Sequence, residues 1–271
     1  MSNSQTAGVQ LSLQNKVALI TGGSRGIGAA TVRLFHQAGA KIAFSYQHAE
    51  AKAAELAESC GGPAHTRAIR HPLNTPEDGQ SLIAATVEAF GRIDILVVNH
   101  GIWPSHEQPI QTMSTQQWNK TININLDASF GLVQAAAAQM LSQPLKQPQH
   151  SHSRGHIVLI SSSAGQRGEA FHADYAASKG AIISLTKSLS TELIGQGIYC
   201  NCVAPGWTNT EMVADVFLQP ERANAALALI PIGRPGNVDE IAGPILFLCT
   251  PYAGFISGEI LNVNGGAVLA G

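Results

Sequence analysis

The chain has 271 residues, of which 45% are hydrophobic and 13% are charged, and its formal net charge is −2. This composition excludes an intrinsically disordered chain, which would need fewer apolar residues and more charge. The near-neutral charge provides no strong field to attract nucleic acid or anionic lipid, so neither is expected as a partner.

The first fifteen residues have neither the basic start nor the apolar stretch of a signal peptide, and no run of about 20 apolar residues could span a membrane. A cytoplasmic location is therefore expected, with residues 1–12 flexible. The four cysteines are too few and too scattered for a disulfide framework, so free buried thiols are expected.

Short apolar runs alternate with helical patterns along the chain. Strands are expected at residues 16–20, 40–45, 93–98, 155–161, 198–203 and 259–263, with a weaker candidate at 64–70. Helices are expected at 26–38, 48–60, 76–90, 115–142, 174–194 and 237–248. The alternation predicts an α/β fold, a Rossmann-type doubly wound parallel sheet of about seven strands with helices on both faces, in a three-layer sandwich. No boundary between two cores is visible, so residues 1–271 are expected to form a single domain.

A glycine-rich turn, TGGSRGIG at residues 21–28, follows the first predicted strand and opens the first helix. Glycines there permit a tight turn and let backbone N–H groups at the helix start approach a diphosphate. The spacing of Gly22, Gly26 and Gly28 departs from G-x-G-x-x-G, and the turn is not a Walker A motif. It also matches the G-x-S-x-G nucleophile elbow of hydrolases, with Ser24 as nucleophile. The position after the first strand argues against that alternative, because no earlier loop could complete an oxyanion hole.

The end of the second strand distinguishes the two nicotinamide cofactors. An acidic residue there normally binds the ribose hydroxyls of NAD(H), but residues 45–48 (SYQH) contain none. Glu50 is better explained as a first-turn residue that complements a helix dipole. Arg25 in the glycine turn could instead contact a 2′-phosphate, so NADP(H) is favoured over NAD(H).

Two later segments differ from the rest of the pattern, one by its apolar surface and the other by its polar composition. The helix expected at residues 126–141 is apolar nearly all round, so it needs cover on more than one side, which a subunit interface would supply. Residues 143–153 predict an exposed loop. Its His150 and His152, with the nearby His156, have no acidic or cysteine partner in the loop, so solvated histidines are favoured and no metal is expected.

Tyr175 and Lys179 lie four residues apart in a helical pattern and therefore share one face. A tyrosine with an ordinary pKa of about 10 shuttles protons poorly at neutral pH, and nearby positive charge would lower that pKa. Lys179 is the expected source, together with an oxidised nicotinamide. Ser162 ends an apolar run at the sheet edge where ligands bind, and its hydroxyl could hold a substrate oxygen. Ser161 and Ser163 remain alternatives.

These motifs, with VNHG at 98–101 and PGWTNT at 205–210, resemble the short-chain dehydrogenase/reductase family over about residues 13–271. The similarity is to members of the 3-oxoacyl-carrier-protein-reductase type and to sugar and alcohol dehydrogenases. It implies that Tyr175 is the general acid or base, that Lys179 lowers its pKa and binds the nicotinamide ribose, and that Ser162 binds the substrate oxygen. Asn125 would hold a water that relays protons.

The resemblance also implies a cofactor site and a homotetramer, or a dimer. The cofactor-binding residues that it implies are Gly22, Ser24, Arg25, Gly26, Ile27, Gly28, Tyr46, Asn99, Gly101, Tyr175, Lys179, Pro205, Gly206, Thr208 and Thr210. Two departures stand out. His100 replaces the family's usual alanine, and the acid expected in the adenine pocket is replaced near His71.

The expected activity is the NAD(P)(H)-dependent interconversion of a ketone or aldehyde with an alcohol by hydride transfer, on a small-molecule substrate. The alternative is a dinucleotide-binding redox-sensing regulator without turnover. The substrate pocket is expected to be lined by mixed apolar side chains, namely Trp103, Phe171, Trp207, Met212, Val213 and Phe217.

Overall fold

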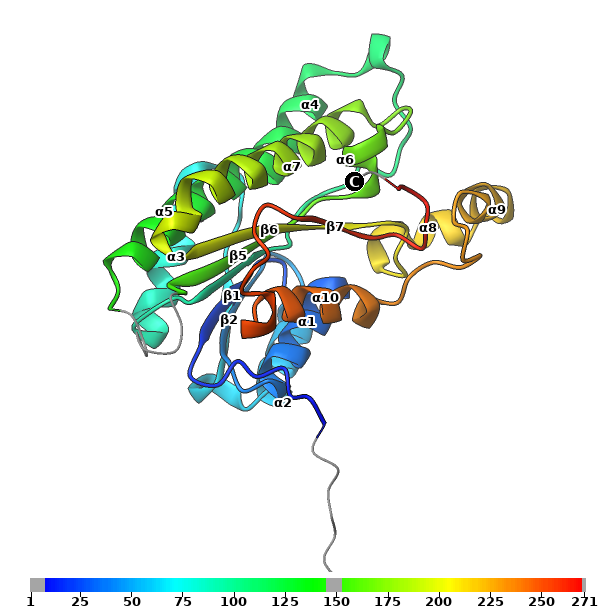
Figure 1. The fold of residues 1–271 in the computed structure, drawn as a ribbon. Helices are drawn as coiled ribbons and strands as arrows, with labels where there is room; N and C mark the ends of the chain where they lie inside the picture. Colours follow the sequence, from blue (N-terminus) through cyan, green and yellow to red (C-terminus); the bar gives the residue numbers. More distant parts are fainter. Residues whose placement is uncertain (1–7, 145–152, 270–271) are drawn as a thin grey trace, which may run out of the picture.

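Seven parallel strands form the centre of the molecule (Figure 1). The structure, a computed structural model, describes residues 8–144 and 153–269. The strands are β1 (Val17–Ile20), β2 (Lys41–Tyr46), β3 (Thr66–Arg70), β4 (Ile95–Val98), β5 (Gly155–Ile160), β6 (Ile198–Pro205) and β7 (Ile260–Val263). Their order in the sheet is β3-β2-β1-β4-β5-β6-β7. The predicted doubly wound parallel sheet is confirmed, including the weaker strand at 64–70.

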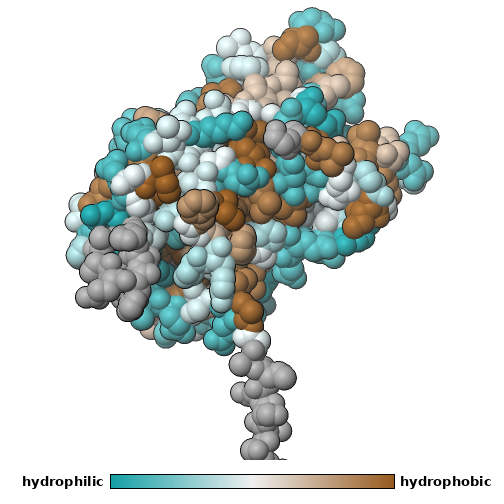
Figure 2. All heavy atoms as spheres, viewed as in Figure 1, coloured by the Kyte–Doolittle hydropathy of each residue, from teal (hydrophilic) through white to brown (hydrophobic). Residues whose placement is uncertain are grey.

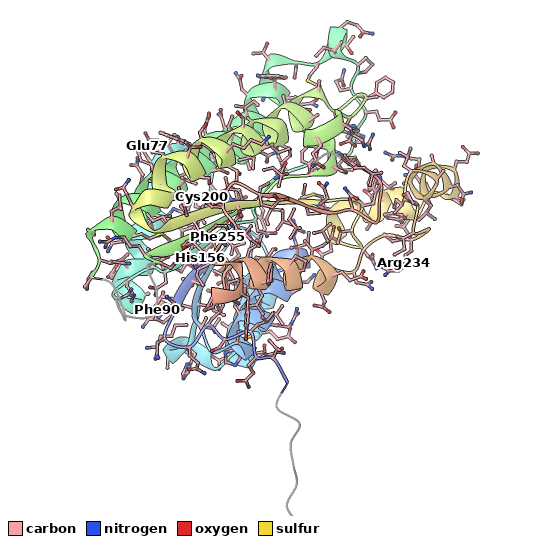
Figure 3. All side chains as sticks on the ribbon, in the orientation of Figure 1. Glu77, Phe90, His156, Cys200, Arg234 and Phe255 are labelled. Atoms are coloured by element: carbon pink, nitrogen blue, oxygen red, sulfur yellow. The ribbon has the colours of Figure 1, made fainter. Side chains whose placement is uncertain are left out.

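Helices cover both faces of the sheet, which gives the predicted three layers (Figure 1). One face carries α1 (Gly26–Gln37), α2 (Glu50–Ser59) and α10 (Val238–Leu248). The other carries α3 (Pro76–Phe90), α4 (Thr115–Ile122), α5 (Ala128–Ser142) and α7 (Ala173–Leu193). Every residue of β1, β4 and β5 is buried, because strands covered on both faces have no solvent side. Figure 3 shows the side chains that fill the space between the layers.

The helix expected at 115–142 is interrupted. A π-helical segment, Asn123–Asp127, separates α4 from α5. Short helices that lack a clear apolar period also escaped prediction: α6 (Ser163–Arg167), α8 (Ala214–Phe217) and α9 (Pro220–Ala228). The 3₁₀ turns are Gly62–Ala64, Ile110–Thr112, Ile194–Gln196, Glu211–Val213 and Pro251–Ala253. Single turns of this kind carry too few residues to show a period.

The apolar helix α5 obtains much of its cover from within the chain. It packs on the sheet and crosses α3 so closely that a Cβ on Gly131 would lie 1.9 Å from the backbone oxygen of Pro76. A Cβ on Gly79 of α3 would meet the backbone N of Leu132 at 2.5 Å. Phe130 stays 46% exposed. The sheet and α3 thus cover one side of this helix, and the expectation that a subunit interface covers the remaining side stays a prediction.

Gln143, the first residue of the loop predicted to be exposed, is instead buried. Its side chain is buried, accepts a hydrogen bond from the backbone N of Ile93 and donates one to the carbonyl of the same residue, both at 2.8 Å. The amide thus satisfies backbone groups just before β4 that would otherwise lack partners. Residues 145–152 of that loop, and residues 1–7 of the N-terminus expected to be flexible, lie outside the described residues.

Two further properties of the chain bear on its sequence-based expectations. All four cysteines are free and buried, as predicted. Within residues 8–144 and 153–269, no helix combines the length and apolarity that crossing a membrane requires.

Candidate active site

The candidate site lies where the sheet order reverses direction. β1 pairs with both β2 and β4, and parallel strands all end at the same edge of the sheet. At such a switch point the connections from neighbouring strands run to opposite faces, which opens a crevice. A cavity of about 720 Å³ occupies this edge, and the segments following β1, β2, β4, β5 and β6 all line it.

The glycine-rich turn after β1 forms one wall of the cavity. Gly22 and Gly26 have positive φ angles of 64° and 54°, which L side chains rarely adopt. A Cβ on Gly28 would lie 2.2 Å from the oxygen of Gly22, so only glycine lets α1 start this close to the turn. The backbone N–H groups at the start of α1 are thus accessible to a diphosphate, and the cradle fits a dinucleotide.

The chain after β4 holds this turn in place. The side-chain amide of Asn99 donates to the oxygens of Thr21 and Gly22, at 3.0 and 3.3 Å. The backbone N of Asn99 donates to the Thr21 hydroxyl at 2.9 Å. Asn99 therefore stabilises the glycine-rich turn through its backbone oxygens and also lines the cavity.

His100 joins three segments of the site. Its Nε2 lies 3.0 Å from the carbonyl of Ile124, and its Nδ1 lies 2.9 Å from the Thr21 hydroxyl. A carbonyl can only accept, so Nε2 carries the proton and Nδ1 accepts from Thr21. Burial and the neighbouring Lys179 lower the pKa of His100 to about 3, which keeps the ring neutral. The residue that replaces the usual alanine thus ties β1 and β4 to the π-helical segment.

This assignment predicts an effect on stability in acid. Because burial lowers the pKa of His100 from 6.5 to about 3, the unfolded chain binds the proton first. The contribution of neutral His100 to the free energy of unfolding is therefore fully present above pH 6.5 and is lost as the pH falls towards 3. Urea unfolding of His100→Ala between about pH 7 and pH 4.5 should show a shallower loss of unfolding free energy than the wild type. The exposed His106→Ala is the control and should keep the wild-type slope, and an unchanged slope in His100→Ala would contradict the assignment.

Tyr175 and Ser162 meet across the cavity. Tyr175 lies in the first turns of α7, and Ser162 precedes α6, where its hydroxyl accepts from the backbone N of Ala164 at 3.1 Å. Burial raises the pKa of Tyr175, and the Ser162 side chain beside its hydroxyl partly offsets that rise. Ser161 is instead buried and donates to the Lys179 carbonyl at 2.7 Å. Of the three serines, Ser162 is the one whose side chain acts on the Tyr175 hydroxyl.

Lys179 and Asn125 converge at Gly101. A Cβ on Gly101 would lie 3.2 Å from Asn125 Oδ1 and 3.4 Å from Lys179 Nζ. Lys179 Nζ donates to the carbonyl of Ile160 at 2.8 Å. Asn125 Oδ1 accepts from the backbone N of Ile102 at 2.8 Å, and its amide donates to the Ile102 carbonyl at 3.0 Å. Asn125 lies in the π-helical segment, and such bulges occur frequently at functional sites.

Burial shifts the pKa values of both expected reacting groups. It raises the pKa of Tyr175 to about 12, since the interior disfavours the phenolate form. It also lowers the pKa of Lys179 to about 8, since the interior disfavours its ammonium form. Lys179 Nζ lies 5.9 Å from the centre of the Tyr175 ring. That Lys179, together with an oxidised nicotinamide, lowers the pKa of Tyr175 stays a prediction.

Most residues expected to bind a cofactor line the cavity. Four of them lie at the end of β6 or just after it, where the Thr208 hydroxyl donates to the Gly206 carbonyl at 3.0 Å: Pro205, Gly206, Thr208 and Thr210. Two expected residues lie behind the wall, Gly28 under the glycine turn and Asn125 at 1% exposure. The remaining expected residues all line the cavity, namely Gly22, Ser24, Arg25, Gly26, Ile27, Tyr46, Asn99, Gly101, Ser162, Tyr175 and Lys179.

The charged partner of Arg25, Glu211, and a second cation that pairs with Glu211 were missed in the sequence. Arg25 Nη1 lies 3.0 Å from a carboxylate oxygen of Glu211, and Lys52 of α2 pairs with the other oxygen. Glu211 thus draws two cations together beside the end of β2. No local pattern marks them, because the three residues come from segments far apart in the chain.

Aromatic side chains form the wall beyond Tyr175. Trp103, Trp207, Met212 and Val213 line the cavity as expected. Trp103 and Trp207 meet edge to face with ring centroids 5.9 Å apart, and Trp207 meets Phe217 in the same way at 6.0 Å. Two expected wall residues are corrected, because neither Phe217 nor Phe171, which is 50% exposed, is among the residues that line the cavity.

An acidic residue in this wall was also missed. Glu169 lines the cavity and accepts a hydrogen bond from Trp103 Nε1 at 3.3 Å. It lies in the loop between α6 and α7, where no motif distinguishes it from a solvated glutamate.

The histidines near residues 143–153 give no metal cluster within the part of the chain that is described. His156, labelled in Figure 3, is buried in β5 and stacks on Tyr199 with ring centroids 5.1 Å apart. His150 and His152 lie outside the described residues.

Comparisons with known proteins agree with this geometry. A family model described as Enoyl-(Acyl carrier protein) reductase matches residues 22–268. The chain is 35% identical to the 3-oxoacyl-(acyl-carrier-protein) reductase of Vibrio cholerae, covering 94% of this chain and 98% of the relative. It is 34% identical to an L-rhamnose 1-dehydrogenase (NAD(P)(+)) of a Sphingomonas species, covering 94% of this chain and 96% of that one.

Solved structures give the same result. A protein of Brucella melitensis titled short-chain dehydrogenase/reductase SDR:Glucose/ribitol dehydrogenase matches with a TM-score of 0.85 at 34% identity, over 97% of this chain and all of that one. A putative NAD(P) dependent gluconate 5-dehydrogenase of Beutenbergia cavernae, with bound NADP, also gives 0.85, at 31% identity over 96% and 99% of the two chains.

Proposed function

We propose, from the premise that this chain belongs to the short-chain dehydrogenase/reductase family and is an NAD(P)(H)-dependent oxidoreductase acting on CH–OH groups, that Tyr175, Lys179, Ser162 and Asn125 are its catalytic set and NADP(H) its preferred cofactor. Family membership replaces the hydrolase alternative based on Ser24, and the comparisons give no support to a redox-sensing regulator.

The observation that carries the catalytic assignment is the meeting of two pairs at one sheet edge. Tyr175 and Ser162 line the same cavity with the serine side chain acting on the tyrosine hydroxyl, and Lys179 and Asn125 converge at Gly101. When bound, a reduced nicotinamide supplies the hydride that the carbonyl carbon accepts. The Tyr175 hydroxyl then donates its proton to the carbonyl oxygen, which the Ser162 hydroxyl holds in place. Lys179 and Asn125 hold the path by which Tyr175 regains a proton.

The reaction can be tested directly on the purified protein. NADPH carrying deuterium at C4 of the nicotinamide should label the carbinol carbon of the product, because hydride transfer moves that atom without exchange with water. Deuterium that reaches the carbinol carbon from solvent D₂O instead would contradict hydride transfer. A protein that binds NADPH by fluorescence titration yet reduces no ketone or aldehyde would revive the regulator.

The preference for NADP(H) is supported by charge at the end of β2. No carboxylate follows Tyr46 in that turn, and Arg25 and Lys52 are held together by Glu211. A 2′-phosphate needs cationic neighbours, and Arg25 lines the cavity. The solved relative with bound NADP is consistent with this proposal.

Substitution of Arg25 tests the preference. We expect Arg25→Ala to weaken NADPH binding by roughly 10-fold or more, because a charge-assisted hydrogen bond to the phosphate is lost. NADH binding should change by less than about twofold, since NADH has no 2′-phosphate. Fluorescence titrations with both cofactors measure the two constants. Arg33→Ala, an exposed position of α1, is the control, and equal weakening of both cofactors in Arg25→Ala would contradict the proposed contact.

Three further inferences stay predictions: a single domain over residues 1–271, a cytoplasmic location and a homotetramer. The exposed rings of Tyr252 and Phe255 support self-association, and Phe255 is labelled in Figure 3. Apolar side chains also form several separate groups among hydrophilic ones on the face drawn in Figure 2. A monomeric mass by light scattering would contradict the oligomer.

A further inference from the structure

We propose that Glu169 is a specificity-determining residue that accepts a hydrogen bond from a hydroxyl group of the substrate, so that the enzyme takes neutral hydroxylated ketones or, in reverse, the corresponding polyols. This inference rests on the proposed function. The contacts that support it involve Trp103 and His172 in the wall beyond Tyr175, and not the proposed catalytic residues.

Glu169 is a carboxylate built into an apolar wall. Its side chain is only 16% exposed, and one oxygen accepts from Trp103 Nε1 at 3.3 Å. The same oxygen lies 3.7 Å from His172 Nδ1. The ring of His172 in turn stacks on Trp103 with centroids 4.7 Å apart. Trp103 and His172 therefore both hold the same carboxylate oxygen, which leaves the other oxygen for a ligand.

The backbone of this loop is also fixed at some cost. Phe171 has a φ angle of 64°, a conformation that residues other than glycine rarely adopt. Its carbonyl accepts from the backbone N of Gln108 at 3.0 Å, which ties the loop to the segment after β4. Unfavourable backbone conformations persist where the surroundings impose them, and they occur often in ligand sites.

A carboxylate in such a place requires a polar partner. Burial raises the pKa of Glu169, because the interior disfavours its charged form. In the described residues, hydrogen bonds are found for only one of its two oxygens, and the residue lines the cavity. A purely apolar substrate would remove water from the carboxylate without replacing its hydrogen bonds, which is unfavourable. A substrate hydroxyl would replace them.

The charges in the wall favour a neutral ligand. Arg167 also lines the cavity and acts electrostatically on Glu169. Arg167 and Lys179 repel a cationic substrate that Glu169 attracts, and Glu169 repels an anionic substrate that the two cations attract, so the mixed charges oppose one another for either kind of ion. A neutral polyol-like ligand can donate to the carboxylate and accept from the guanidinium, while its C–H groups pack on Trp103 and Trp207.

The loop also connects this wall to the reacting group. Tyr175 follows Glu169 by six positions, and the charge of Glu169 acts on the tyrosine hydroxyl. We therefore expect one small molecule to place its carbonyl at Tyr175 and a hydroxyl at Glu169.

The experiment compares ketones that share one ring. Cyclohexanone, its 2-, 3- and 4-hydroxy derivatives, 4-aminocyclohexanone and 4-oxocyclohexanecarboxylate are reduced with NADPH, and kcat/KM is measured for each. We expect at least one hydroxyketone to exceed cyclohexanone by roughly 10- to 100-fold in the wild type, the range of one charge-assisted hydrogen bond. This ratio does not depend on the folded fraction of a variant.

Two variants assign that ratio to Glu169. Glu169→Leu should bring it close to one, and Glu169→Gln should leave an intermediate value because its amide oxygen still accepts. Glu192→Gln, on the exposed far end of α7, should keep the wild-type ratio. An unchanged ratio in Glu169→Leu would overturn the inference.

The other outcomes are equally decisive. Reduction of cyclohexanone without preference for any hydroxyketone overturns the inference and leaves the proposed function intact. A preference for the amino or the carboxylate derivative that is lost in Glu169→Leu overturns the neutral substrate class. Failure of the wild type to reduce any of the six ketones, or to transfer deuterium to any other carbonyl compound, overturns the proposed function as well.

Discussion

Replacement of Tyr175 by phenylalanine should lower kcat by roughly 10²- to 10⁴-fold, the range that a positioned general acid contributes. The hydroxyl is the only group removed, and the ring keeps its place at the start of α7. The fold and the glycine turn are unaffected, so NADPH should still bind, weakened by no more than about 10-fold through loss of the one contact that the Tyr175 hydroxyl is expected to make with it. The measurements are steady-state kinetics and a fluorescence titration of NADPH.

The matched control is Tyr252→Phe, which removes the hydroxyl of a tyrosine that is 61% exposed on a 3₁₀ turn. It should retain wild-type kcat. A Tyr175→Phe enzyme that turned over at a normal rate would contradict the assigned role of the tyrosine, because protonation of the carbonyl oxygen would then not depend on its hydroxyl. Loss of NADPH binding in the same variant would indicate a structural defect instead.

The second large effect concerns stability at the crossing of α3 and α5. A Cβ on Gly131 would lie 1.9 Å from the backbone oxygen of Pro76, and backbone atoms cannot move aside as a flexible side chain can. We expect Gly131→Ala to lower the free energy of unfolding by about 3 kcal/mol, the upper range for overpacking a core, or to prevent folding. Urea unfolding followed by circular dichroism measures it.

Gly243 of α10 provides the control, because a Cβ there would have no atom within 4 Å. Gly243→Ala should raise the free energy of unfolding by about 0.5–1 kcal/mol, since alanine restricts the unfolded chain and favours helix. Two glycine-to-alanine changes in helices thus have opposite expected signs. Equal effects at both positions would show that helix propensity, and not the close crossing, determines the result.

How much could be predicted from the sequence differs between the fold and the site. The strands and most long helices were predicted, because alternation of apolar runs with helical periods is a local signal. The glycine turn, Tyr175 and Lys179 were recognisable from spacing along one segment. The π-helical interruption around Asn125 was not, since five residues carry no period that distinguishes them from the α-helix on either side.

The charged partners show the limit most clearly. Arg25 was predicted as a cofactor residue, but its pairing with Glu211 joins positions 186 residues apart in the chain. The roles of His100 and Glu169 likewise depend on Ile124 and Trp103, which lie in other elements. Hydrogen-bonded contacts of this kind leave no trace in the local pattern.

The sequence by itself therefore determined the class of fold and marked the glycine turn and Tyr175 as candidate site residues, because each depends on residues that are neighbours along the chain or share one helix face. Only the tertiary structure decided which serine side chain acts on Tyr175, which tautomer His100 adopts and which acid lines the cavity. These depend on distances between segments that folding brings together, and burial there changes the pKa of groups whose types alone predict ordinary values.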